Sequence, residues 1–115
     1  MEEENVPEPV ESPEGAAVFP LIPPELGVNP LLLGMLHAYV FLEGSEPNII
    51  DPDAAFEAME YLAGYLQRMT GKELMRTRED LDTLAGYAKE QKWPRQQVAF
   101  LKSFLEENGV TGETE

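Results

Sequence analysis

The segment from Leu31 to Leu42 constrains the fold most, because its apolar residues would surround any helix that it forms. Ten of its twelve residues are apolar, and the other two are Gly34 and His37. A helix at the surface of a small domain normally has a polar stripe that faces water. The segment is also shorter than the ~20 apolar residues that a membrane span needs. The sequence therefore predicts a helix whose second face is covered by another part of the chain, a second copy or a different protein.

Two dipeptides are typical of helix starts. Asn29-Pro30 and Asp51-Pro52 each place a capping side chain directly before a proline, which is favoured at the first helical position. They predict helices over residues 30–43 and 52–70. Glycine is favoured in the left-handed conformation just past a helix end. Gly44 and Gly71 are therefore expected to end these two helices.

Two further helices are predicted in the C-terminal half. Thr77, with an acidic residue three positions later, resembles a capping box and predicts a helix over 78–92. The apolar register of Leu74 also allows that helix to begin near Lys72. Pro94 starts a last helix, which is expected to end before Gly109. No segment alternates as a strand does, so the expected fold is all-α, a small antiparallel bundle of about four helices.

The composition divides the chain into four regions. Residues 1–15 are rich in Glu and Pro and predict a disordered acidic tail. Residues 16–28 form an apolar Pro-rich arm, for which an extended conformation is expected. The helical domain covers 29–110, and a second disordered tail covers 111–115. The sequence leaves open whether the arm packs on its own helices or on another chain.

The charge and the residue types exclude several classes of function. The net charge is −14, and residues 1–29 contain seven acidic residues and no basic one, which argues against non-specific nucleic-acid binding. The chain has no cysteine, so disulfides, thiolate zinc sites and a cysteine nucleophile are excluded. The acidic N-terminus does not resemble a secretory signal. We therefore expect a cytoplasmic protein without membrane association.

The first helix is the strongest candidate for an interface. We expect it to form a homodimer contact with help from the arm, while a monomer whose arm fills the gap is the alternative. A different protein could also cover the helix. The expected interface residues on the helix and the arm are Leu32, Met35, Leu36, Tyr39, Val40, Phe19, Leu21 and Ile22.

A short repeat marks a second candidate surface. Leu62-Ala63-Gly64-Tyr65 recurs 22 residues later as Leu84-Ala85-Gly86-Tyr87, a spacing that returns to nearly the same helical face. Two helices that need a similar crossing would explain the repeat. It also predicts two shallow depressions that receive a partner, formed by Gly64, Tyr65, Gly86 and Tyr87.

A run of basic residues supports an alternative prediction of the function. It consists of Arg68, Lys72, Arg76 and Arg78, and three of these recur every four residues. If the run is helical, these side chains would align, and the chain could then be a nucleic-acid-associated regulator.

Residues with catalytic chemistry are sparse. His37 is the only histidine, and it lies in the apolar helix rather than near a serine or a second metal ligand. The sequence therefore predicts no catalytic constellation, no cofactor and no metal site. The expected function is that of a non-catalytic protein-interaction or regulatory module.

Overall fold

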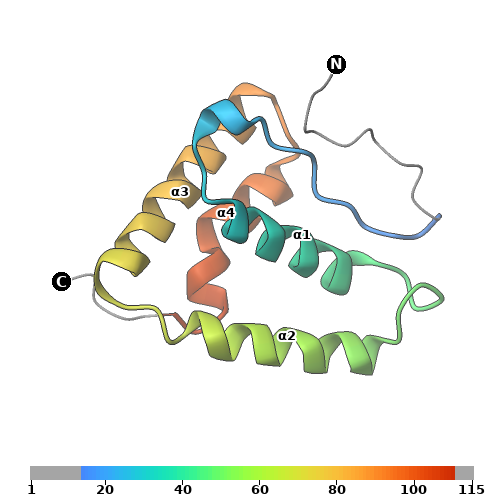
Figure 1. Ribbon diagram of the computed structural model, residues 1–115. Coiled ribbons are helices and arrows are strands. Elements are labelled where there is room, and N and C mark those ends of the chain that lie inside the picture. Colours follow the sequence, from blue (N-terminus) through green and yellow to red (C-terminus); the bar gives the residue numbers. More distant parts are fainter. Residues whose placement is uncertain (1–13, 111–115) are drawn as a thin grey trace, which may run out of the picture.

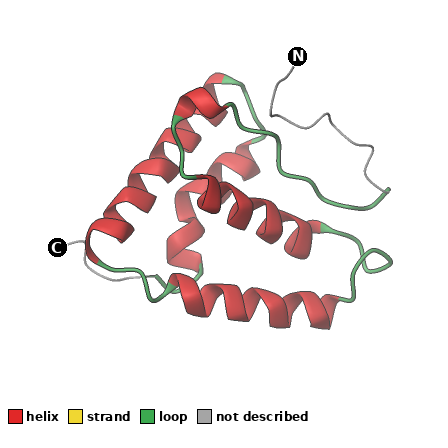
Figure 2. Cartoon of the chain, in the orientation of Figure 1, coloured by secondary structure: helices red, strands yellow, loops and turns green. Residues whose placement is uncertain are grey.

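The computed structural model describes residues 14–110, which contain helices and no strand (Figures 1 and 2). A short 3-10 helix, η1 (Pro24–Leu26), precedes four α-helices: α1 (Pro30–Gly44), α2 (Pro52–Leu66), α3 (Gly71–Glu90) and α4 (Arg95–Glu107). Helix α1 contacts α2, and α3 contacts α4, so the chain forms two successive helical hairpins. The expected all-α bundle is confirmed. The predicted tails lie outside the described residues, apart from a turn at residues 14 and 15.

Both predicted helix starts are confirmed by the capping geometry. The Asn29 side chain accepts a hydrogen bond from the backbone N–H of Leu31 at 2.8 Å. The Asp51 carboxylate accepts one from the N–H of Ala54 at 3.0 Å. Each bond satisfies a backbone donor that has no partner inside its helix, which explains why these residues occur there.

The junction between α2 and α3 differs from the expectation at Thr77. Its hydroxyl donates to the carbonyl of Glu73 at 3.0 Å, which places Thr77 inside a helix and not at its start. The earlier start is correct: α3 begins at Gly71, and Leu74 lies inside it and is fully buried. Helix α2 ends at Leu66, earlier than predicted, and Gly71 takes the left-handed conformation where α3 begins.

Gly44 has a different role from the expected one. It lies within α1 rather than in a left-handed position beyond its end. A Cβ atom at this position would lie 2.9 Å from the Cβ of Ala17 in the arm. The glycine therefore allows the arm to approach the helix closely. By contrast, Gly109 is left-handed as predicted, and the N–H of Val110 donates to the carbonyl of Leu105 at 2.9 Å.

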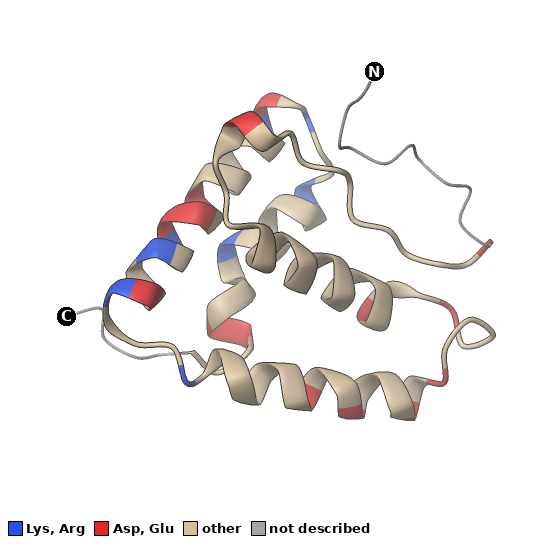
Figure 3. Ribbon diagram, in the orientation of Figure 1, with Lys and Arg blue, Asp and Glu red and all other residues tan. Residues whose placement is uncertain are grey.

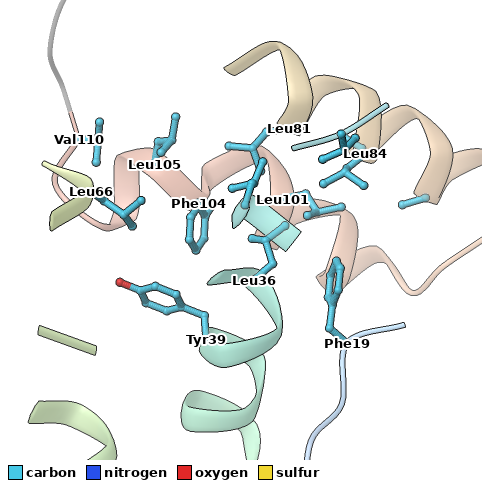
Figure 4. Packing of buried hydrophobic residues seen from close by; sticks show 14 of the residues in the cluster. Phe19, Leu36, Tyr39, Leu66, Leu81, Leu84, Leu101, Phe104, Leu105 and Val110 are labelled. Carbon is cyan, nitrogen blue, oxygen red and sulfur yellow. The ribbon is translucent and has the colours of Figure 1, made fainter. Parts of the chain in front are cut away.

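The core lies where α1 meets the α3–α4 hairpin (Figure 4). The Tyr39 ring of α1 packs edge-on against the Phe104 ring of α4, with the ring centroids 5.0 Å apart. Leu36 lies beside this pair and is fully buried. One side of the apolar helix is therefore covered by the second hairpin. The largest fully buried side chains are Phe19, Phe104, Leu36, Leu74, Leu84 and Leu101.

The Pro-rich arm covers a second side of α1 within the same chain. It runs beside the helix in the opposite direction (Figure 1), and Ala17 N–H donates to the Ser45 hydroxyl at 2.9 Å near the end of α1. Further along, the fully buried Phe19 ring packs edge-on against His37 at 5.1 Å and against Trp93 at 5.7 Å. The arm thus joins α1 to the loop between α3 and α4.

A buried carboxylate fixes the other end of the arm. Asp80 of α3 is only 5% exposed and accepts a hydrogen bond from the N–H of Asn29 at 3.1 Å. It also pairs with the Arg76 guanidinium at 3.1 Å. Arg76 in turn donates to the carbonyl of Gly27 at 3.1 Å. These bonds satisfy backbone groups at the point where the arm becomes α1, and they attach this point to α3.

Replacement of Phe19 tests whether the arm is part of the folded unit. Phe19→Ala should lower the free energy of unfolding by about 3 kcal/mol or more, because it leaves a cavity between His37 and Trp93. Urea unfolding followed by circular dichroism measures the change. The control is Val18→Ala, whose side chain is 56% exposed and should change stability by less than about 0.5 kcal/mol. Equal effects of the two variants would contradict a docked arm.

Two glycines should respond oppositely to alanine. A Cβ at Gly86, in α3, would meet no other atom within 4 Å, so Gly86→Ala should stabilise the protein by about 0.5–1 kcal/mol. Gly44→Ala should instead cost about 1 kcal/mol or more, because its methyl group would collide with Ala17. Thermal unfolding of both variants measures the signs. Stabilisation by Gly44→Ala would show that the arm does not approach α1 closely.

Candidate interaction surfaces

One stripe of α1 is covered neither by the core nor by the arm. It comprises Leu31, Gly34, Ala38 and Phe41, which recur at helical spacing of three and four residues. Leu31 is 82% exposed and Phe41 is 36% exposed. A Cβ at Gly34 would meet no atom within 4 Å. Ala38, between Gly34 and Phe41, is half-buried. The stripe carries no charge, so it is a partly exposed apolar face of the helix.

The fold places the eight expected interface residues in three environments. Phe19, Leu32, Leu36 and Tyr39 are buried inside the chain, where they hold the arm and the two hairpins together. They do not contribute open surface in this fold. Three others, Ile22, Met35 and Val40, are half-buried against the core. The last, Leu21, is 48% exposed. A contact of α1 with a second copy stays a prediction. The surface of α1 that is open for such a contact is the stripe described above.

A groove lies between α2, α1 and α4, on a side of α1 away from the stripe. Its volume is about 560 Å³. The floor and walls are mainly apolar: Phe104 and Tyr39 are buried at the base, whereas Phe56 is 60% exposed on the α2 side. The lining residues are Tyr39, Glu43, Phe56, Met59, Glu60, Ala63, Gly64, Gln67, Phe100, Phe104, Glu107, Asn108 and Gly109.

The uncharged polar side chains of the groove are already used within the chain. The Tyr39 hydroxyl donates to the carbonyl of Met59 at 3.3 Å. The Gln67 amide donates to the carbonyl of Asn108 at 2.9 Å, and the Asn108 amide donates to the carbonyl of Phe104 at 2.7 Å. The groove also offers a ligand aromatic surface and three exposed carboxylates, those of Glu43, Glu60 and Glu107.

The electrostatics of the groove are negative. Burial raises the pKa of the Tyr39 hydroxyl, and the charge of the Glu43 carboxylate raises it further. None of the lining residues is Lys or Arg. All eight basic residues of the chain lie between Arg68 and Lys102, whereas residues 30–66 contain six acidic residues and no basic one. Figure 3 shows the result, with acidic positions and no basic ones along α2 and both kinds along α3.

The repeated Leu-Ala-Gly-Tyr segments lie on different helices and in different surroundings. Gly64 lines the groove, and Tyr65 beside it is 58% exposed, with Arg68 stacked over its ring at 4.8 Å. Gly86 is an exposed position on α3, and Tyr87 is half-buried against Trp93. One of the two predicted depressions thus coincides with the groove wall. That these residues receive a partner stays a prediction.

The basic run does not form one continuous stripe. Arg68 lies in the turn before α3, and only Lys72 and Arg76 follow each other at helical spacing on α3. Arg76 is engaged with Asp80 and with the arm, and Arg78 also has an interaction partner. The cations are therefore used in part to hold the fold together.

The groove was not found from the sequence. Its aromatic walls come from Phe56 and Phe100, which belong to different hairpins and are 44 positions apart. Phe56 does carry a signal in retrospect, because it lies outside the apolar stripe that buries Ala55 and Leu66. A large aromatic residue beyond the buried face of a helix marks exposed apolar surface.

Comparisons of the chain with protein-family models, with curated proteins and with solved structures gave no match. Within residues 14–110, no three or more His, Cys, Asp or Glu side chains gather where they could hold a metal ion. No helix in this part of the chain combines the length and the apolarity needed to cross a membrane. The α1 stripe and the groove are the two candidate functional surfaces of the described chain.

His37 gives a pH-dependent prediction. Burial lowers its pKa, so the unfolded chain binds the proton more tightly than the folded chain does. The free energy of unfolding should therefore fall as the pH drops below the ordinary histidine value of about 6.5, and this loss should continue down to the lowered pKa. His37→Gln should reduce the decrease between about pH 7.5 and 5.5, where few carboxylates titrate. Identical pH profiles of the two proteins in urea unfolding would contradict the prediction.

Proposed function

We propose that the chain is a cytoplasmic, non-catalytic protein-interaction module that self-associates through the outward stripe of α1. The observation that carries this proposal is the uncharged apolar face of Leu31, Gly34, Ala38 and Phe41. Solvent exposure of these side chains forgoes burial worth roughly 25 cal/mol for each Å² of apolar surface. A contact that covers the stripe recovers this free energy.

The order of residue sizes along the stripe supports a second copy as the occupant. Two large side chains, Leu31 and Phe41, flank the small residues Gly34 and Ala38. A two-fold contact places the same surface of both copies face to face. In an antiparallel crossing of two α1 helices, Leu31 of one copy meets Phe41 of the other, and the small residues allow the helices to approach at the centre. The stripe is therefore complementary to itself.

The charge distribution also favours this face. The net charge of the protein is −14, so two copies repel each other at long range. The stripe contains no charged residue, so a contact through it brings no like charges together. Because salt screens the residual repulsion, association should become tighter as the ionic strength rises.

Sedimentation equilibrium over a concentration series tests the proposal. The wild-type chain should dimerise, and Leu31→Glu should weaken the dimer by about a hundredfold, because the substitution removes two buried leucines from each symmetric contact. Leu31 is 82% exposed in the chain, so this change should leave the fold intact. The matched control is Met75→Glu, which changes an exposed apolar residue on α3. A strict monomer at high protein and salt concentrations would overturn the proposal.

A further inference from the structure

We infer that the groove between α2 and the rest of the molecule binds a cationic amphipathic segment of another protein. The groove and the α1 stripe use different residues, so this inference does not depend on self-association. It follows from two properties of the lining: aromatic walls and a rim of carboxylates.

The aromatic walls define the apolar part of the partner. Phe56 of α2 and Phe100 of α4 line the groove above the buried Phe104 and Tyr39 rings, and the half-buried Met59 lies among them. A volume of about 560 Å³ accommodates a few bulky apolar side chains. Aromatic and methionine side chains form adaptable apolar surfaces of the kind that receive one face of a helix.

The rim defines the charge of the partner. Glu43, Glu60 and Glu107 come from α1, α2 and α4, so they surround the apolar floor from three helices. Lys or Arg side chains flanking the apolar residues of a bound segment would pair with these carboxylates, while an acidic segment would be repelled.

The two terminal segments of this sequence do not suit the groove. Gly109 belongs to the lining, so the C-terminal residues 111–115 are the nearest candidates in sequence. They read Thr-Gly-Glu-Thr-Glu, with no large apolar residue and no cation. The first thirteen residues contain five glutamates and no basic residue. Both tails carry the same charge as the rim, which favours an occupant from a different protein.

Binding of a model peptide tests the inference directly. The probe is a fluorescent amphipathic peptide of about 18 residues, made of Leu and Lys, with leucines at helical spacing of three and four. We expect saturable binding in fluorescence anisotropy that weakens as salt is added. Two comparison peptides serve as controls. In the first, Glu replaces every Lys of the probe; in the second, Gly replaces every Leu and the Lys residues are kept. Neither should bind, because each lacks one of the two required properties.

Matched variants on one helix locate the site. Phe56→Ser and Glu60→Lys change groove residues that are exposed, and each should weaken peptide binding by about tenfold or more. Tyr61→Ser and Glu57→Lys make the same kinds of change outside the lining and should alter affinity by less than about twofold. In amide NMR spectra, the peptide should shift Gly64 and Gly109, which line the groove, but not Gly34 or Gly86.

Each contrary result has a distinct meaning. The inference would be overturned if the groove and control variants weakened peptide binding equally, or if the Lys–Gly peptide bound as tightly as the Leu–Lys peptide. Either result would show that the protein attracts cations in general. Absence of binding at low salt would overturn the inference as well. If Phe56→Ser abolished self-association while Leu31→Glu did not, the groove would be the contact between copies, and a foreign segment would not be its occupant. If the wild-type protein is monomeric and still binds the Leu–Lys peptide, only the self-association proposal is contradicted.

Discussion

The packing of Phe19 against α1 is the interaction on which the rest of the structure depends. Helix α1 has no polar side, and the α3–α4 hairpin covers only one face of it. The arm covers a second face by inserting Phe19 between His37 and Trp93, which belong to different parts of the fold. Without this ring, α1 would expose apolar surface on two sides, and the loop after α3 would lose its contact with the first hairpin.

The same constraint determines which surfaces remain available for function. The core uses one side of α1 and the arm uses another, so a narrow apolar stripe and one wall of the groove remain. The stripe is uncharged, whereas the groove combines aromatic walls with a carboxylate rim. Surfaces of such different character select different partners, since apolar area drives association and complementary charge selects the partner. The two proposals therefore assign a copy of the chain and a second protein to separate faces of the bundle.

The sequence predicted the local features of the fold well. Asn29 and Asp51 cap helices, Gly109 ends one, and the all-α bundle is confirmed, because these features depend on neighbouring residues. The predictions from the sequence were wrong where contacts between residues far apart in the chain determine the local structure. Gly44 is required by Ala17, and Thr77 is inside a helix because Leu74 is buried against other elements. The groove was missed for the same reason, since its walls come from both hairpins and no local pattern joins them.

The arm covers its own helix and not that of a neighbouring copy. Isotope-filtered NOE spectroscopy on a mixture of labelled and unlabelled chains measures this directly, through contacts of the Phe19 ring with Trp93, the only tryptophan. These contacts should appear within single labelled chains and not between labelled and unlabelled chains, even in a sample that self-associates. Cross-peaks between chains would show an arm exchanged between copies and would contradict the account.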